Sequence, residues 1–170
     1  FYDVKQGEPY DIYGVVSKEL KYARMFKKAH FSPRTDDVLI GELLGYPKCC
    51  IKFFKKVWPE SYDPIWDAGL NTKGKIKNGL DIYIEDEFPE TNILLRYFGI
   101  RAVPHLVCSF KCKESLELAE MFLSTIDHKR KLLDILSSPM VWDCYKGVAI
   151  VDTKWFIGVA NSMPYRRKHR

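Results

Sequence analysis

Residues 104–112 read P-H-L-V-C-S-F-K-C and bring one imidazole and two thiols together within nine residues. Two residues separate His105 from Cys108, and three separate Cys108 from Cys112. Such spacings let a single turn of backbone direct several soft ligand atoms toward one point. The segment therefore has the pattern of a metal site, and its remaining ligands must come from elsewhere in the chain.

The adjacent pair Cys49-Cys50 is the predicted partner of this segment. Pro47 suits the first position of a helix over residues 47–57, because its missing N–H would have no partner there. Both thiols then lie in the first helical turn, where free N–H groups and the helix dipole favour a thiolate. Adjacent side chains on a regular helix diverge, so the use of both thiols requires a helix start that is not fully wound. Cys50 also falls on the apolar arc of this helix, where it can serve as a small buried hydrophobic residue.

The two segments together supply four thiols and one imidazole, from Cys49, Cys50, Cys108, Cys112 and His105. Four thiolates favour zinc or an iron–sulfur cluster over hard ions. His105 either replaces one thiol or hydrogen-bonds a sulfur atom. The sequence thus predicts a metal site built from these five residues. Two alternatives stay open. One is thiol-based redox or sulfur-transfer chemistry, with Cys49 as the attacking thiolate, and the other is cysteines buried for packing alone.

Two phrases of the sequence resemble the signature of a family of uncharacterised, mainly archaeal proteins known as a domain of unknown function. These phrases are L-L-G-Y-P-K-C-C at Leu43–Cys50 and P-H-L-V-C-S-F-K-C-K-E-S at Pro104–Ser115. The resemblance implies that the four cysteines and His105 form the shared feature of the family, and it brings no established activity. Relatives often have a proline directly before the first cysteine of the second phrase, where this chain has Val107.

Hydrophobic periodicity predicts a mostly helical α+β domain. A helical period, helix caps and breakers indicate helices over residues 17–30, 36–44, 47–57, 90–97 and 113–136, with a short helix after Pro64. Alternation with a period of two predicts a strand over residues 80–85. Residues 147–152 and 155–160 predict a C-terminal hairpin. We therefore expect an α+β fold in which residues 1–164 form a single globular domain with a small antiparallel sheet.

The composition is that of a globular protein. Of the 170 residues, 46% are hydrophobic and 29% are charged, which argues against a disordered chain. A chain of this length buries a core without needing disulfides. No apolar run approaches the roughly 20 residues that a membrane-spanning helix needs. We expect no membrane contact.

The formal charge of +5 is concentrated at the C-terminus, because four of its five units come from Arg166, Arg167, Lys168 and Arg170. The rest of the chain is nearly neutral, so residues 165–170 are predicted to form a solvated basic tail. An alternative hypothesis is an RNA-associated module that uses this tail, the Lys73–Lys77 loop and exposed aromatic side chains.

Cysteine usage predicts a cytoplasmic protein. The count of five is odd, and no signal peptide precedes the cysteines, so we expect reduced thiols rather than disulfides. Cys144 lies between Trp142 and Tyr145 and is predicted to serve packing. The chain begins at Phe1 without an initiator methionine, which is typical of a trimmed chain or a fragment.

Overall fold

In the part of the chain that it describes, the computed structural model consists mainly of short helices. It describes residues 14–61, 64–72, 75–77, 81–84, 87–137, 140–143, 148–152 and 157–161, and in the strands it describes the backbone alone.

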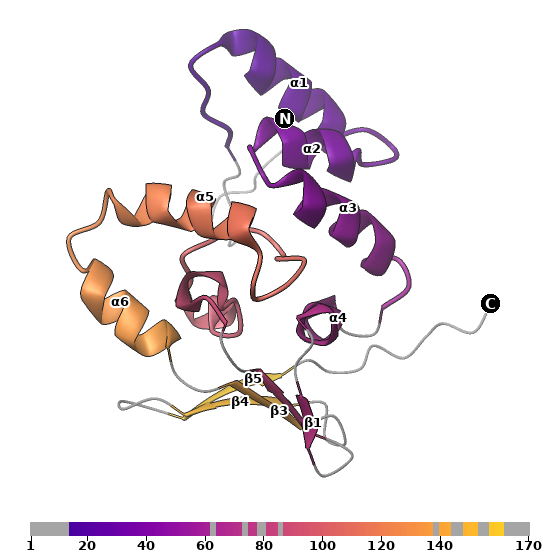
Figure 1. Cartoon of the computed structure of the whole chain (residues 1–170). Helices are drawn as coiled ribbons and strands as arrows, with labels where there is room; N and C mark the ends of the chain where they lie inside the picture. Colours follow the sequence, from indigo (N-terminus) through magenta and orange to yellow (C-terminus); the bar gives the residue numbers. More distant parts are fainter. Residues whose placement is uncertain are drawn as a thin grey trace, which may run out of the picture.

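Three helices pack in succession at one end of the molecule, in the upper part of Figure 1. They are α1 (Leu20–His30), α2 (Asp37–Leu43) and α3 (Lys48–Val57). Asp36 caps α2, because its side chain accepts a hydrogen bond from the Leu39 amide at 3.0 Å. Gly45 follows α2 with φ of 71°, a left-handed conformation that ends the helix and turns the chain toward α3.

The remaining helical elements surround the main hydrophobic core. They are α4 (Pro64–Asn71), the single 3₁₀ turns η1 (Pro89–Thr91) and η2 (Arg96–Phe98), α5 (Lys113–Leu123) and α6 (Lys129–Leu136). The core cluster consists of buried side chains from these helices and from the loops between them: Ile65, Ala68, Ile93, Leu94, Leu95, Ala102, Val103, Val107, Phe110, Ala119, Leu123 and Leu136.

The prediction of a helix over residues 90–97 is wrong. The chain forms η1 and η2 there, and the fully buried residues Ile93, Leu94 and Leu95 come between them. The side chain of the buried Asn92 makes two hydrogen bonds. Its Oδ1 accepts from the Leu94 N–H at 3.0 Å, and its Nδ2 donates to the Leu136 carbonyl at 2.9 Å. A short polar side chain that bonds nearby backbone in this way competes with helix formation.

The prediction of an α+β fold with a small antiparallel sheet is also wrong for the part of the chain whose side chains are described. Wherever the structure describes side chains, the regular elements are helices, and no residue there lies in a strand. The backbone alone traces five strands in the antiparallel order β1-β2-β3-β4-β5, namely β1 (Lys75–Lys77), β2 (Asp81–Ile84), β3 (Met140–Asp143), β4 (Val148–Asp152) and β5 (Ile157–Asn161). A two-residue period suggests strands but not what they pack against, and the described core cluster takes its residues from helices and loops and none from a strand.

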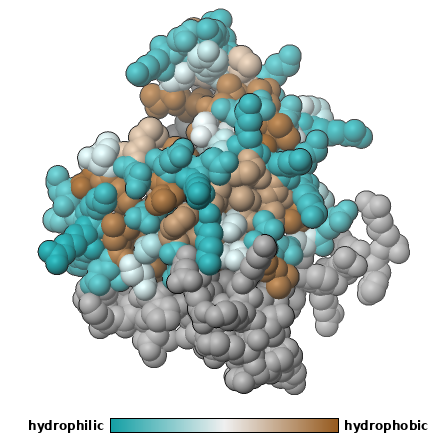
Figure 2. Space-filling model, in the orientation of Figure 1, coloured by the Kyte–Doolittle hydropathy of each residue, from teal (hydrophilic) through white to brown (hydrophobic). Residues whose placement is uncertain are grey.

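The surface in Figure 2 is mostly hydrophilic on the outer faces of the helices, and hydrophobic residues gather between the N-terminal helices and α5. Among the described helices, none combines the length and the apolar character required to cross a lipid bilayer.

Candidate metal centre

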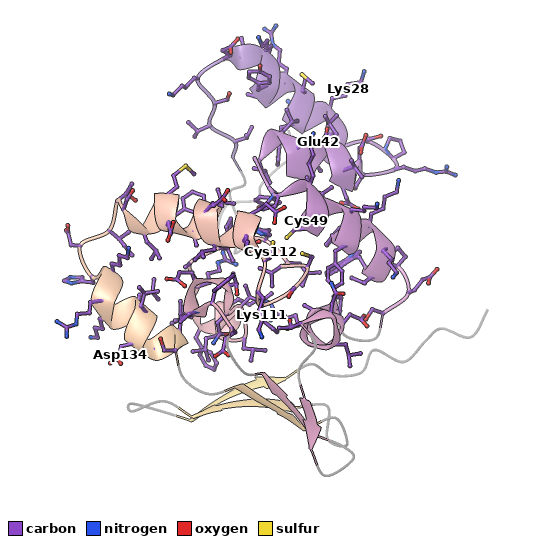
Figure 3. The ribbon with its side chains drawn as sticks, viewed as in Figure 1. Lys28, Glu42, Cys49, Lys111, Cys112 and Asp134 are labelled. Atoms are coloured by element: carbon purple, nitrogen blue, oxygen red, sulfur yellow. The ribbon has the colours of Figure 1, made fainter. Side chains whose placement is uncertain are left out.

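Four cysteine sulfur atoms meet where the start of α3 approaches the start of α5 (Figure 3). The Sγ atom of Cys49 lies 3.8 Å from that of Cys50 and 3.5 Å from that of Cys112. The Sγ atoms of Cys50 and Cys112 are 3.8 Å apart. Cys108 completes the group, in which all four sulfur atoms lie within 4.8 Å of one another. The structure thus joins the two segments in one cluster that can hold a metal ion.

The start of α3 positions the first two thiols. Pro47 precedes the helix in an extended conformation, with φ of −56° and ψ of 134°, and its carbonyl accepts hydrogen bonds from the amides of Cys50 and Ile51 at 2.9 and 3.0 Å. The Pro47 carbonyl is thus shared between an i→i+3 and an i→i+4 hydrogen bond, as is common at helix termini. From this first turn, the sulfur atoms of both Cys49 and Cys50 lie close to that of Cys112.

The loop that carries Cys108 is fixed by the end of α4. The Asn71 side-chain amide donates to the Cys108 carbonyl at 2.7 Å. The Thr72 hydroxyl accepts from the Phe110 amide at 2.9 Å and from the Ser109 hydroxyl at 3.2 Å, and it donates to the Ala68 carbonyl at 2.6 Å. The position of Cys108 therefore depends on polar contacts from a helix about 40 residues earlier in the chain.

Cys112 is the N-cap residue of α5, and Ser115 follows one turn later, fully buried. The Ser115 hydroxyl lies 3.3 Å from the Cys50 sulfur and 2.9 Å from His105 Nε2. The Cys50 sulfur also accepts a hydrogen bond from the Cys108 amide at 3.3 Å. Ser115 thus connects the sulfur cluster to the imidazole.

His105 is not part of the four-sulfur group. Its Nε2 faces Ser115, and its ring packs on Tyr46, with the ring centroids 5.0 Å apart. The side chain is only 6% exposed, and this burial lowers the pKa of His105 to about 4, so the imidazole is neutral at neutral pH. The sequence predicted His105 as either a metal ligand or a group that hydrogen-bonds a sulfur atom; in the structure, its Nε2 is connected to the Cys50 sulfur through the Ser115 hydroxyl.

The thiols differ in proton affinity because they lie so close together. Burial, followed by the nearby Cys50, raises the pKa of Cys49 to about 12. The pKa of Cys108 is raised because its S–H donates to Cys112 and Cys50. The pKa of Cys112 is lowered by the hydrogen bonds it accepts from Cys108 and Cys50. For Cys50, the hydrogen bond from Cys108 lowers the pKa, but the contact with Cys112 and burial outweigh it and the net shift is upward. The four thiols therefore titrate as one coupled group.

Sequence reasoning missed Asn71, Thr72 and Ser115. A signal for Ser115 was present, because Ser115, Ala119 and Leu123 recur every four residues and all three are buried on one face of α5. No sequence signal marks Asn71 or Thr72, because their contacts form only when α4 meets the distant loop.

Other predicted features lie outside the described residues or away from the site. Cys144, Lys73 and the tail at 165–170 are not among the described residues. Of the loop predicted over Lys73–Lys77, the last three residues form β1, where the backbone alone is described. Their predicted roles in packing and RNA binding remain predictions. His30 and His128 are exposed, at the end of α1 and before α6 respectively.

Comparison with protein-family models, with curated proteins and with solved structures finds no match to this chain. The resemblance of residues 43–50 and 104–115 to an archaeal family therefore remains a prediction.

Proposed function

We propose that the chain binds one zinc ion through Cys49, Cys50, Cys108 and Cys112. The sulfur–sulfur separations carry this proposal. A zinc–sulfur bond of about 2.3 Å implies a tetrahedral edge of roughly 3.8 Å between thiolates. The three pairs formed by Cys49, Cys50 and Cys112 are separated by 3.5, 3.8 and 3.8 Å.

These separations favour a single ion over an iron–sulfur cluster. In a cluster, each thiolate binds its own iron or shares an iron with one other, so the sulfur atoms stand farther apart than around one ion. Here all four sulfur atoms lie within 4.8 Å of one another. A single iron bound by four thiolates would have the same geometry, and metal analysis separates it from zinc.

A four-thiolate site is closed, because it leaves no open position for water or substrate. When bound, zinc would neutralise thiolate charge and cross-link the start of α3 to the segment before α5. The protein's own groups prepare the site: the Cys108 amide and the Ser115 hydroxyl both lie within hydrogen-bonding distance of the Cys50 sulfur. Hydrogen bonds of this kind stabilise a coordinated thiolate and orient it. The proposed role of the metal is therefore structural.

Metal analysis of anaerobically purified protein tests the proposal. We expect about one zinc per chain, and a strong loss of zinc in Cys112→Ser, because three thiolates remain. Cys144→Ser is the matched control and should keep its zinc, since the set of four thiols is complete without it. Less than about 0.2 metal per wild-type chain, with all thiols freely titratable, contradicts the proposal.

A second candidate is thiol-based redox chemistry, favoured by one observation. Cys49 is only partly buried, and its sulfur lies 3.5 Å from that of Cys112. Peroxide can oxidise one thiolate to a sulfenic acid, which the second thiolate then attacks to form a disulfide and release water. Mass spectrometry after peroxide treatment should find a Cys49–Cys112 disulfide. Oxidation without a preferred cysteine argues against this candidate.

A further inference from the structure

The outward face of α3 consists of lysine side chains. At about 100° of rotation per residue, four lysines fall within one arc of roughly 100° on the helix surface. They are Lys48, Lys52, Lys55 and Lys56. All four are exposed, and none of them forms an ion pair with another described residue. The face therefore presents four uncompensated positive charges to solvent.

Positive charge is also concentrated in the helices around α3. Residues 17–58, which include α1, α2 and α3, contain ten Lys and Arg residues and only four Asp and Glu residues. This part alone carries more positive charge than the whole chain, whose formal charge is +5. The nearly neutral body inferred from the sequence thus averages a basic α1–α3 region with a more acidic remainder. A basic region of this kind attracts polyanions.

Trp58 adds an aromatic surface at the end of the lysine face. It follows Lys55 by three residues, so the two side chains are neighbours on the helix surface. The Trp58 amide donates to the Phe54 carbonyl at 2.9 Å, and its ring stacks on that of Phe54, with the centroids 4.9 Å apart and the planes at 22°. Trp58 is nevertheless 60% exposed. The indole is thus held in place and remains accessible to a planar ligand.

This combination of charges and an exposed ring fits single-stranded nucleic acid. Lysines contact phosphates without regard to sequence, and aromatic side chains stack on unpaired bases. A membrane surface fits less well, because an interfacial helix inserts its apolar side chains among the lipids, whereas Cys50, Ile51 and Val57 of α3 are buried inside the protein. An acidic peptide would pair with the lysines but has no base to stack on Trp58.

We propose that the outward face of α3 and Trp58 bind single-stranded nucleic acid, with the lysines on phosphates and a base stacked on the indole. The inference goes beyond the proposed metal centre and uses none of its ligands. It also differs from the RNA-binding hypothesis based on the tail and the Lys73–Lys77 loop, because every side chain it needs lies on α3 or at its end.

Fluorescence anisotropy with a short, labelled oligothymidylate tests the role of the lysines. On a double-logarithmic plot, affinity should fall with salt with a slope of about −0.7 for each phosphate contact. Lys52→Gln combined with Lys56→Gln should therefore weaken binding and reduce the magnitude of the slope by about 1.4. Lys129→Gln combined with Lys131→Gln makes the same change of charge on α6 and should leave the slope unchanged.

An abasic oligomer of the same length, which keeps the phosphates and lacks the bases, tests the role of Trp58. Trp58→Ala should lower the affinity for oligothymidylate about tenfold, with the same salt slope, and should leave the affinity for the abasic oligomer nearly unchanged. Phe98→Ala is the matched control, because Phe98 lies in η2 and is 57% exposed. Circular dichroism verifies the fold of each variant.

Four results would overturn the inference. The first is no binding by the wild-type chain at low salt. The second is unchanged binding in both α3 variants, which would assign binding to another part of the chain, such as the predicted basic tail. The third is equal wild-type affinity for the two oligomers, because phosphates alone would then explain binding. The fourth is displacement of oligothymidylate by polyglutamate at equal charge concentration, which would assign the face to an acidic protein.

Discussion

Replacing Thr72 with valine tests whether α4 fixes the position of the loop that carries Cys108. The Thr72 side chain is buried, and its hydroxyl makes three hydrogen bonds, to Ala68, Ser109 and Phe110. Valine has nearly the same shape as threonine, so the substitution removes these bonds without opening a cavity. The Phe110 amide then loses its partner in a region where Phe110 itself is fully buried.

The expected cost follows from these contacts. An unsatisfied buried amide costs about 1–3 kcal/mol, and the Ala68 carbonyl loses a further bond. We therefore expect the free energy of unfolding to fall by about 2–3 kcal/mol in Thr72→Val. Zinc affinity should also fall, by roughly tenfold, because part of the binding free energy must now order the 108–112 loop.

Urea denaturation and competition with a zinc chelator measure the two quantities. Thr125→Val is the matched control, since its hydroxyl donates to the Phe122 carbonyl at 2.7 Å from an exposed position. Its effect on stability should stay within about 0.5 kcal/mol. Equal losses of stability in the two variants, or unchanged zinc affinity in Thr72→Val, refute the role assigned to α4.

Three further predictions concern pH, the backbone and metal binding. The folded pKa of His105 is about 4, below the unfolded value of roughly 6.5, so the unfolded chain binds more protons between these values. In urea titrations from pH 6.5 to pH 4, the free energy of unfolding of the wild-type chain should therefore fall by up to about 3 kcal/mol more than that of His105→Phe. The same pH dependence in both proteins would contradict this prediction. Gly45 has φ of 71°, and a β-carbon added to it would meet no heavy atom within 4 Å. Gly45→Ala should therefore lower the free energy of unfolding by about 1–2 kcal/mol through backbone strain alone, and Gly45→Asn should lower it less. Thermal unfolding measures both variants. Because the pKa of Cys49 is raised to about 12, its proton must leave when zinc binds. Calorimetry in buffers of different ionisation enthalpy should thus detect proton release, and zinc affinity should rise with pH; a pH-independent affinity argues against thiolate coordination.

Local sequence signals predicted the elements whose boundaries depend on local chemistry. Gly45 and Pro47 separate α2 from α3, as their conformational preferences require. Ser17 was a misleading signal. Its hydroxyl accepts from the Glu19 amide at 3.3 Å, and α1 begins only at Leu20. Such a local bond competes with the cap that the sequence suggests.

Features that depend on contacts between distant segments of the chain could not be predicted from the sequence in the same way. The sequence identified the cysteines as soft donors, but it left open whether His105 replaces one thiol or hydrogen-bonds a sulfur atom. That outcome depends on Ser115, which lies between His105 and Cys50 only after α5 packs against α3. The apolar period at residues 92–95 likewise could not show that Asn92 would bond to α6.

The position of the four thiols indicates what the proposed metal would do for the whole chain. No residue of α1 or α2 belongs to the main hydrophobic core cluster, and α3 contributes only the partly buried Phe53 at its margin. The cysteines of α3 meet Cys108, which follows the core residue Val107 in the chain, and Cys112, which comes two residues after the core residue Phe110. Without metal, these contacts are weak hydrogen bonds between sulfur atoms; with metal, they become four strong bonds to one ion. Because the two sides meet at this point, the free energy of the proposed metal binding would contribute directly to the docking of α1–α3 on the rest of the fold.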